Sequence, residues 1–411
     1  MKKEIVSVLM SAYLLVGCGG GSGGDAGSDD STTGVVTLTK EELGERLFFD
    51  ANLSLTRKTS CSTCHNPEHG FVDNRFAKEG TDQSIFVHGA LSVGDDGSAL
   101  GGRNAPTAAY AKFSPDFDVK SLKGGQFHDG RAASLKEQSK RPPLDSNEMM
   151  MPDAASVVAR IQENPLYVAS FKALFTESIF DDTDAAYDAM GEVIGKFEKT
   201  ELFSPFDSKY DRYVACKEAG GRTSECLAQG AWTVDEQLGM DLFFSDANTN
   251  CKTCHMLKTQ SEVSGETFSN YEYHNIGTPK NSQTIEARYQ LGLGEQNATE
   301  HGVFGAYPNE VNASKDAAIK VPTLRNVAIT APYMHNGVFM NLKTVLAFYD
   351  HMGSGDRPLN PETQEAWGEP DVNATINRTD LAMPVLNDRK IEALEAFLKT
   401  LTDKRYESLI Q

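Results

Sequence analysis

The sequence contains Leu238–Phe244 (LGMDLFF), followed closely by Cys251–His255 (CKTCH). The same pair of motifs occurs once more upstream, as Leu43–Phe49 (LGERLFF) and Cys61–His65 (CSTCH). In a Cys-x-x-Cys-His run, the two thiols can bond to the vinyl groups of a haem while the His binds the haem iron. The repetition therefore predicts two c-type haem modules that are related by duplication.

A single zinc site built from two Cys-x-x-Cys knuckles is the alternative for the same four thiols. It does not explain why both knuckles are followed directly by His, a residue found at 9 of 411 positions. We therefore favour haem over zinc. The predicted attachment residues are Cys61, Cys64, Cys251 and Cys254, and the predicted iron ligands are His65 and His255.

The chain is acidic, with 58 Asp and Glu against 39 Lys and Arg and a net charge of -19. Nucleic acid is therefore not an expected partner, because like charges repel. A small basic electron carrier would be attracted instead. The same charge is also typical of a protein that only needs to stay soluble outside the cytoplasm.

The N-terminus predicts export. Two lysines precede an apolar run from Ile5 to Val16, which is too short to remain as a membrane-spanning helix, and Leu15–Cys18 (LVGC) has the pattern of a bacterial lipobox. We expect a signal peptide over residues 1–17 and a lipid on Cys18 as the only membrane attachment. The expected location is the periplasm or the cell surface.

Two further cysteines, Cys216 and Cys226, stand ten positions apart in a Gly-rich loop. Outside the cytoplasm they are expected to pair in a disulfide, and two unpaired thiols are the alternative. Haem attachment and disulfide formation both belong to extracytoplasmic proteins, so this expectation agrees with export.

The remaining composition predicts a mainly α protein made of two cytochrome c-like haem domains with long ordered loops and little strand. Residues 18–37 are mostly Gly, Ser, Asp and Thr, which is typical of a flexible tether. The first haem domain is predicted over 38–203 and the second over 204–411. Apolar spacing over 391–401 predicts an amphipathic terminal helix.

Four further motifs are Gly102–Thr107 (GRNAPT), Gly124–Arg131 (GGQFHDGR), Val321–Asn326 (VPTLRN) and Ala331–Gly337 (APYMHNG). With the two haem motifs, and in this order, they resemble those of bacterial dihaem cytochrome c peroxidases and of the related protein-oxidising enzyme MauG. The likeness extends from about residue 38 to the C-terminus. It implies two covalent haems, of which the first reacts with hydrogen peroxide and the second delivers electrons.

The first haem site needs a proton carrier. An iron held by His65 and open on its opposite face can bind peroxide, and cleavage of the O–O bond requires a group that moves a proton between the two oxygens. We predict Glu148 for this role, because a carboxyl in an apolar pocket can hold a proton near neutral pH. Gln138 is predicted to orient the peroxide. The resemblance supports both residues, and a solvated Glu148 beside a Met-rich turn is the alternative.

The second haem needs a sixth ligand, or it would be reactive as well. The resemblance implies a Met in the peroxidases and a Tyr in MauG-like members, and the matching position here is Tyr349. A phenolate favours ferric and higher states, whereas a thioether favours ferrous iron. Met352 on the same helix face, and a purely structural Tyr349, are the alternatives.

Two positions between and around the haems depart from the family pattern. In many members a His upstream of the GRNAPT motif caps the first iron at rest, and His88 has this order in a longer loop; an exposed loop His is the alternative. The family carries Trp between the haems, where this chain has His128. Imidazole is much harder to oxidise than indole, so His128 is a poor carrier of charge between the haems.

The resemblance also implies one Ca2+ between the domains. The matching residues are Asn104, through its side chain, and Thr330 and Pro332, through their carbonyls. Calcium prefers hard oxygen donors of this kind. A turn capped by Asn104 is the alternative.

The leading prediction is a dihaem c-type peroxidase that takes electrons from a small donor protein, either a cytochrome c or a cupredoxin. MauG-like oxidation of side chains on a partner protein is the first alternative, and Tyr349 favours it. The second alternative is a non-enzymatic surface electron-transfer cytochrome with two six-coordinate irons. The resemblance leaves a homodimer open.

Overall fold

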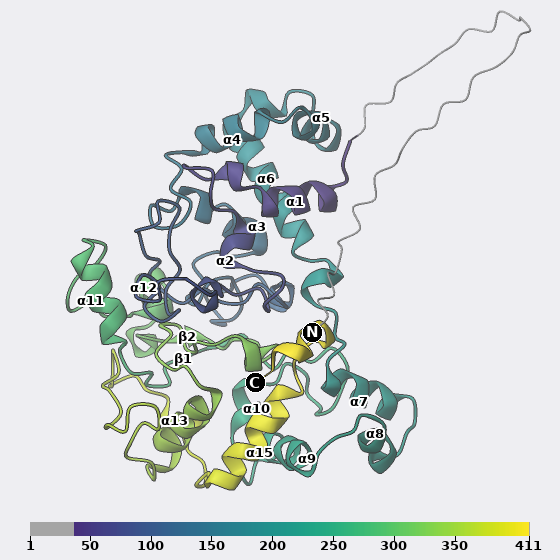
Figure 1. Ribbon diagram of the computed structural model, residues 1–411, viewed down its shortest axis with the longest axis vertical. Coiled ribbons are helices and arrows are strands. Elements are labelled where there is room, and N and C mark those ends of the chain that lie inside the picture. Colours follow the sequence, from purple (N-terminus) through teal and green to yellow (C-terminus); the bar gives the residue numbers. More distant parts are fainter. Residues whose placement is uncertain (1–36, 411) are drawn as a thin grey trace, which may run out of the picture. The chain divides into compact units, whose positions relative to one another are not determined.

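The computed structural model describes residues 37–410, which form one compact unit (Figure 1). The predicted signal peptide, Cys18 and all but the last residue of the predicted tether lie outside the described residues. Over the part of the chain that is described, no helix is long and apolar enough to span a bilayer.

The described chain is mainly helical, which confirms the predicted class. The α-helices are α1 Lys40–Phe49, α2 Cys61–Cys64, α3 Leu135–Ser139, α4 Ala154–Gln162, α5 Pro165–Leu174, α6 Thr183–Phe197, α7 Lys209–Glu218, α8 Thr223–Gln229, α9 Val234–Phe243, α10 Cys251–Cys254, α11 Ser282–Gln290, α12 Gly302–Ala306, α13 Leu342–Ser354, α14 Arg378–Leu381 and α15 Asp388–Lys399. Two short strands, β1 Tyr273–His274 and β2 Ile319–Lys320, pair antiparallel with Tyr273 opposite Lys320.

Short 3₁₀ helices punctuate the loops between these elements. They are η1 Ala51–Leu53, η2 Arg75–Ala77, η3 Ala111–Phe113, η4 Pro142–Leu144, η5 Ile179–Asp181, η6 Glu201–Phe203, η7 Ala313–Lys315, η8 Val327–Ile329 and η9 Lys404–Leu409. Much of the chain between α2 and α3 is therefore ordered loop, as its Gly- and Pro-rich composition predicts.

The two haem motifs are each preceded by a helix that begins in the same way. The Thr39 hydroxyl accepts a hydrogen bond from the Glu42 amide at 3.2 Å, and the Glu42 carboxylate accepts from the Thr39 amide at 2.8 Å. Thr233 and Glu236 repeat this reciprocal pair at the start of α9, at 3.2 Å and 2.6 Å. Each pair satisfies amides that a helix start leaves without a partner.

Each of these helices crosses a later helix at a glycine. A Cβ on Gly44 of α1 would lie 1.9 Å from the Val193 carbonyl oxygen of α6, and one on Gly239 of α9 would lie 1.9 Å from the Ala393 carbonyl oxygen of α15. Figure 1 shows α15 running alongside α9. Because no side chain fits at either crossing, glycine is required at both.

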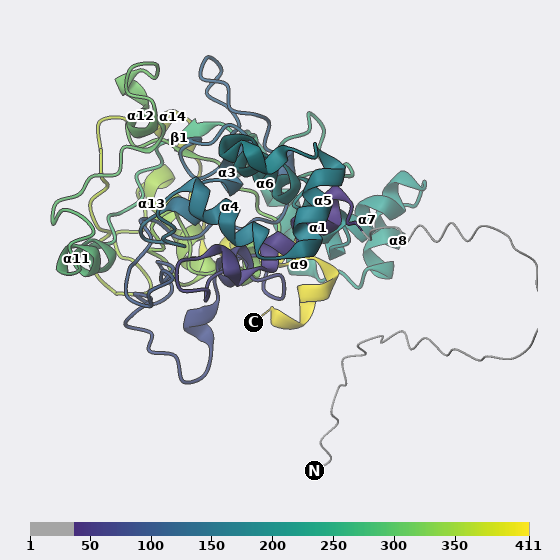
Figure 2. The ribbon, with the colours of Figure 1, turned by 90° about the horizontal axis from the view of Figure 1, so that it is seen from above.

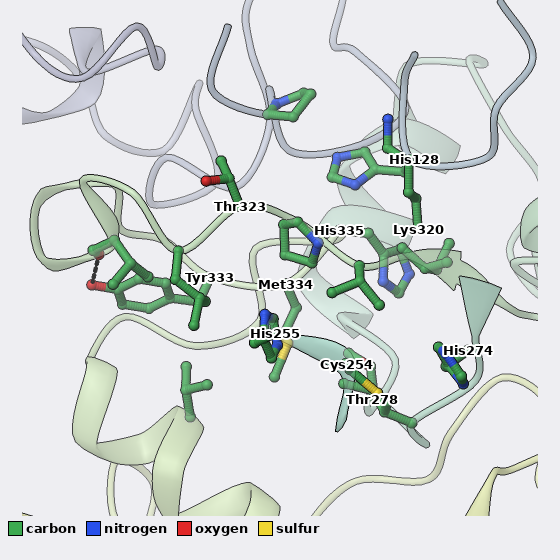
Figure 3. Close-up of a pocket in the computed structure, with 18 of the residues that line it drawn as sticks. His128, Cys254, His255, His274, Thr278, Lys320, Thr323, Tyr333, Met334 and His335 are labelled. Carbon is green, nitrogen blue, oxygen red and sulfur yellow. Dashed lines mark hydrogen bonds between the residues drawn. The ribbon is translucent and has the colours of Figure 1, made fainter. Parts of the chain in front are cut away.

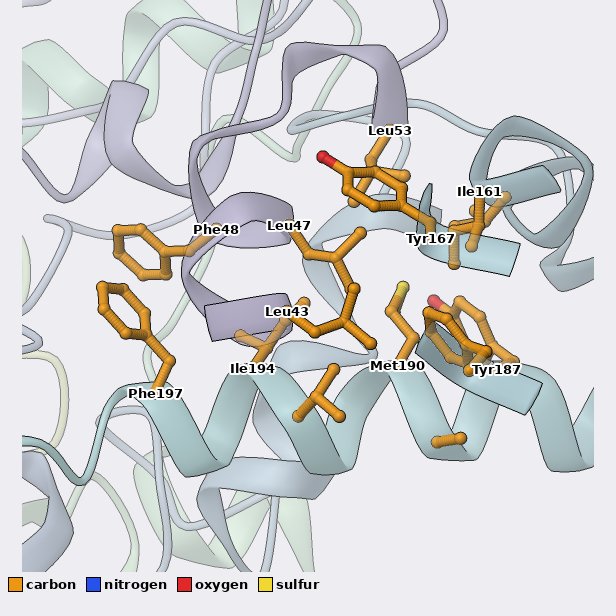
Figure 4. Close-up of a cluster of buried hydrophobic side chains, with 14 of the residues drawn as sticks. Leu43, Leu47, Phe48, Leu53, Ile161, Tyr167, Tyr187, Met190, Ile194 and Phe197 are labelled. Atoms are coloured by element: carbon orange, nitrogen blue, oxygen red, sulfur yellow. The ribbon is translucent and has the colours of Figure 1, made fainter. Parts of the chain in front are cut away.

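Two hydrophobic cores surround these crossings. The first includes Leu43 and Phe48 of α1, which face Ile194 and Phe197 of α6 (Figure 4). The second is built largely on α9, α13 and α15. The first core draws residues from 43–203 and the second from 210–401. Both belong to one compact unit, so the domain boundary at residue 203 remains a prediction.

Helices α7 and α8 lie side by side in both Figure 1 and Figure 2. A disulfide joins Cys216 of α7 to Cys226 of α8. Cys226 is buried in the second core and Cys216 packs against it. The two cysteines therefore pin this helix pair to the second core.

Substitution of Gly239 by Ala is expected to lower the free energy of unfolding by about 1–3 kcal/mol or more, because the added methyl group forces the two helices apart. Urea unfolding of the holoprotein, followed by circular dichroism, measures this change. Gly294→Ala is the control, since a Cβ there meets its nearest atom at 3.7 Å. Equal midpoints for the two variants would contradict the glycine requirement.

Candidate haem sites and the region between them

The two motif histidines are oriented by the same backbone device. Nδ1 of His65 lies 3.2 Å from the Phe71 carbonyl oxygen, and Nδ1 of His255 lies 3.0 Å from that of Phe268. Both phenylalanines adopt left-handed backbone angles, with φ of 55° and 56°. A carbonyl only accepts hydrogen bonds, so each Nδ1 carries the proton and each lone pair is on Nε2, the nitrogen available to an iron.

Burial keeps both imidazoles neutral. It lowers the pKa of His65, and it lowers the pKa of His255 to about 4. A neutral imidazole whose other nitrogen is hydrogen-bonded is the form that binds iron in proteins. Both histidines thus fit the role predicted for them.

A cavity of about 340 Å³ adjoins the second haem motif. Cys251, Cys254 and His255 line it, and Tyr349 of α13 lines it as well. The remaining lining near α13 and α15 is apolar and includes Phe243, Leu342, Val345, Leu346, Leu386, Leu394 and Leu398. A largely apolar cavity with two thiols, an oriented imidazole and a phenol has the donors and the polarity that a covalent haem requires.

The structure separates the two candidates for the sixth ligand of the second haem. Tyr349 belongs to the cavity lining, and burial raises the pKa of its phenol. Met352 is not a lining residue; its methyl carbon packs against Gly277, 2.6 Å from where a Cβ on that glycine would lie. This geometry favours Tyr349, although its ligation of iron remains a prediction.

Glu148 lies beside the first haem motif. Burial is the main cause that raises the pKa of the Cys61 and Cys64 thiols, and the charge of Glu148 adds to both shifts. Burial, followed by the nearby Asp145, raises the pKa of Glu148 to about 7. The carboxyl can therefore both accept and release a proton at neutral pH, as predicted for the proton carrier.

Gln138 lies on α3, with a partly exposed side chain. Helix α3 packs against α6 and contacts η4, which precedes the turn that carries Glu148. The role of Gln138 in orienting peroxide remains a prediction.

Comparison with known proteins identifies the family. Residues 39–219 match the model of the family "Di-haem cytochrome c peroxidase". The chain is 42% identical to the methylamine utilization protein MauG of Paracoccus denitrificans over 90% of both chains, and 28% identical to the cytochrome c551 peroxidase of Pseudomonas aeruginosa over 80% of this chain and 77% of the relative. The crystal structure of the dihaem peroxidase BthA from Burkholderia thailandensis superposes with a TM-score of 0.72 at 26% identity, over 90% of this chain and 88% of that one.

The chain belongs to the dihaem cytochrome c peroxidase and MauG family. The relatives are oxidoreductases, and the family is dihaem, in agreement with the two oriented histidines and the thiols beside them. The family resemblance predicted from the sequence motifs is thereby confirmed.

Within this dihaem family fold, His128 lies in the same pocket as the second haem motif. Figure 3 shows His255 and Cys254 below His128 and Lys320 in this pocket. Nε2 of His128 lies 2.9 Å from the Asn104 carbonyl oxygen. Burial, together with the nearby Arg103, lowers the pKa of His128 to about 3, so the ring stays neutral. A neutral, pinned imidazole occupies the position where the family pattern has Trp.

The predicted calcium ligands come together across the sequence. The Asn104 side-chain amide donates to the Pro332 carbonyl at 2.6 Å, over a separation of 228 residues. Thr330 and Pro332 line the same cavity as Asn104. Over residues 37–410, no group of three or more His, Cys, Asp or Glu side chains is arranged to hold a metal. Carbonyl oxygens of the kind predicted here are not side-chain ligands of that type, so calcium remains a prediction.

His88 lies on the surface. Its side chain is exposed, and its backbone adopts a φ of 56° in a turn where its amide donates to the Gln83 carbonyl at 3.2 Å. This placement agrees with the alternative of an exposed loop His. Ligation of the first iron by His88 would require the turn to move, and it remains a prediction.

Two charged residues that line the pocket, Glu300 and Lys320, have no role assigned from the sequence. Arg103 pairs with Glu300 at 2.7 Å and with Asp129 at 2.6 Å. Lys320 donates to the Gly125 carbonyl, and burial lowers its pKa to about 7. Arg103 and Asp129 fall within the sequence motifs named above, so the sequence could have indicated them as functional residues. Glu300 and Lys320 stand in segments with no recognisable pattern.

Two covalent haems are expected per chain. Replacement of both Cys251 and Cys254 by Ala should lower the pyridine haemochrome absorbance per chain to about half, because only one pair of attachment thiols remains. Mass spectrometry of the denatured variant should find one attached haem. A wild-type protein that contained zinc and no covalent haem would contradict this expectation.

Proposed function

We propose that this protein reduces hydrogen peroxide to water at its first haem site, with electrons delivered through the second. The observation that carries the proposal is Glu148, a partly buried carboxyl with a pKa near 7 whose charge acts on Cys61 and Cys64. A haem bound at these cysteines and at His65 supplies an iron that can bind peroxide and pass electrons to it.

Glu148 performs the proton transfer in this proposal. Its carboxylate takes a proton from one oxygen of the peroxide and gives it to the other oxygen. The oxygen that receives the proton leaves as water when the O–O bond breaks. In the whole reaction one peroxide, two electrons and two protons give two water molecules. The Phe71 carbonyl holds His65 in place during these steps through the bond to Nδ1.

Electrons are proposed to enter at the second site. His255 and Tyr349 both line the cavity there, and an iron held by both side chains would be closed to peroxide. The net charge of -19 favours a small basic donor, such as a cytochrome c or a cupredoxin, through electrostatic steering.

A MauG-like reaction is the second candidate, in which the electrons come from side chains of a partner protein. Tyr349 supports it, because a phenolate ligand would keep the second iron hard to reduce. The 42% identity to a methylamine utilization protein MauG supports it as well. A non-enzymatic electron-transfer cytochrome, by contrast, would show no response to peroxide.

We further propose export to the periplasm or cell surface, with a lipid on Cys18 and one Ca2+ near Asn104. The disulfide between Cys216 and Cys226 and the thiol pairs of the haem motifs support an oxidising compartment. Membrane release of a Cys18→Ala variant after cell fractionation would test the anchor.

Replacement of Glu148 by Gln is expected to slow the reaction of the first haem with peroxide by about 10²–10⁴-fold, since the amide cannot accept the proton. In the wild-type protein the rate should fall about tenfold per pH unit below about pH 7, where the raised pKa leaves the carboxyl protonated. Stopped-flow absorbance spectroscopy measures both effects. Glu79→Gln, at an exposed position of the same module, is the control. A Glu148→Gln variant as fast as wild type would refute the assigned role.

Replacement of Tyr349 by Met is expected to raise the reduction potential of the second haem by on the order of 0.1 V or more, within the roughly 0.8 V that axial ligands span. A spectroelectrochemical titration measures the change. Met352→Leu is the matched control on the same helix. If only the Met352 variant shifts the potential, the ligand assignment is reversed.

A further inference from the structure

Glu198 is a buried carboxyl that the proposed reaction does not use. Glu198 directly follows α6 and is only 4% exposed. Its Oε2 has no hydrogen-bond partner among the described residues. Burial raises its pKa to about 8. Buried carboxyl oxygens normally have partners, so the surroundings of this group need an explanation.

The internal duplication locates Glu198 relative to a haem site. A Cβ on Gly44 would lie 2.9 Å from Cβ of Phe197, and a Cβ on Gly239 would lie 2.7 Å from Cβ of Phe397. The two phenylalanines therefore occupy the same place in the two helix crossings.

The aromatic contacts repeat as well. The ring of Phe197 lies 5.5 Å from that of Phe48, and the ring of Phe397 lies 5.2 Å from that of Phe243. Figure 4 shows the first of these pairs, with Phe48 above Phe197. Because the frames match on both sides of the crossing, the residue after Phe197 corresponds to the residue after Phe397.

These following residues are Glu198 and Leu398. Leu398 lines the cavity of the second haem motif together with Cys251 and His255. In the first module, Glu198 is the strongest charged influence that raises the pKa of the Cys61 thiol. Two independent observations, the repeat and the electrostatic reach, thus place the Glu198 carboxyl toward the first haem site.

We propose that Glu198 exchanges a proton with solvent when the first haem site changes its redox state. The Glu198 carboxylate binds one proton when this site gains one electron. A haem held at Cys61, Cys64 and His65 would take the electron, which the donor protein supplies through the second site, and the Glu198 carboxylate would take one proton from solvent to become the carboxylic acid. No other bond changes. An added negative charge in a poorly solvated site favours protonation of a nearby carboxylate.

At the second site, reduction is not coupled to proton uptake by a carboxyl, because Leu398 occupies the position that Glu198 has at the first site. Reduction of peroxide consumes two protons with two electrons, so Glu198 would store one of the protons beside the site before peroxide arrives. The inference rests on the covalent haem at Cys61 and Cys64 but not on the reaction with peroxide, so the two can fail separately.

Few other charged groups face Glu198. Lys199 is the neighbouring cation that acts on its pKa, and the Cys61 sulfur cannot ionise once it is bonded to the porphyrin, which it holds without touching the iron. The hydroxyls of Thr200 and Ser204 are also buried without partners among residues 37–410. They offer bonding groups to the water molecules through which a proton would reach the carboxyl.

The test is a spectroelectrochemical titration of both haems in the holoprotein, from about pH 5 to about pH 10. Glu198 should contribute no slope to the first potential while it is protonated in both states, and a fall of up to about 59 mV per pH unit once the oxidised form ionises, near pH 8. The second potential should stay constant over this range. Glu198→Gln and Glu198→Leu should both abolish the slope at the first haem.

Three controls make the result specific. Glu148→Gln should keep the slope that begins near pH 8, because Glu148, with a pKa of about 7, contributes only a slope that begins at lower pH. Leu398→Glu should give the second haem a slope of its own. At about pH 9, where the oxidised form of Glu198 is ionised, infrared difference spectra of reduced minus oxidised protein should show a new protonated-carboxyl band in wild type and in Glu148→Gln but not in Glu198→Gln.

The infrared result stands even if Leu398→Glu fails to bind haem. A slope that survives in Glu198→Gln, or that disappears only in Glu148→Gln, would overturn the proposal. Equal slopes at the two haems would overturn it too, since they would assign the proton to the propionates that both haems carry.

Discussion

The close crossing of two helices at a glycine positions each haem motif. A Cβ added at Gly44 or Gly239 would stand 1.9 Å from a carbonyl oxygen of the partner helix, so the backbones touch where side chains normally separate them. Each crossing orients the Phe-Phe pair that ends the first helix, and the haem motif follows within twenty residues. A phenylalanine with left-handed backbone angles then directs its carbonyl toward Nδ1 of the motif histidine. The orientation of the iron-binding nitrogen is thus inherited from backbone contacts, which do not depend on the haem.

The duplicated frame carries different chemistry at its two sites. Near the second motif, the position after Phe397 and its surroundings are apolar, and a phenol on α13 faces the cavity. Near the first motif, Glu148 and Glu198 are carboxyls with raised pKa values. After burial, the charges of these two residues contribute to the raised pKa of the Cys61 thiol. A low-dielectric site that holds carboxyls near neutrality can exchange protons, whereas an apolar one can only exchange electrons. The proposed reduction of peroxide would use both kinds of site.

Local patterns explain why much of this was predictable. The helix starts at Thr39 and Thr233, the motif histidines and the helical α class follow from residues close together in the sequence. The location of Tyr349 in the cavity followed from a motif match, because a helix fixes which residues share a face. Sequence spacing did not reveal that Glu198 is buried, since its burial depends on a helix crossing more than a hundred residues from its partner. The Arg103–Glu300 pair could not be predicted from local sequence patterns either, because its residues are 197 positions apart.

Communication between the two sites depends on the packing that joins the two cores. His128 is neutral and pinned, so it contributes little as a carrier of charge. The cores are instead connected by Tyr110, whose hydroxyl donates to Asp403 at 2.5 Å, and by the guanidinium of Arg325, which lies 5.3 Å from the Tyr110 ring and pairs with Asp211 at 2.6 Å. Removal of one partner from a buried ion pair typically costs about 3–5 kcal/mol, so this connection resists rearrangement. Since the rate of electron tunnelling falls with distance, a rigid buried contact that fixes the separation of the two sites can serve where an oxidisable side chain is missing.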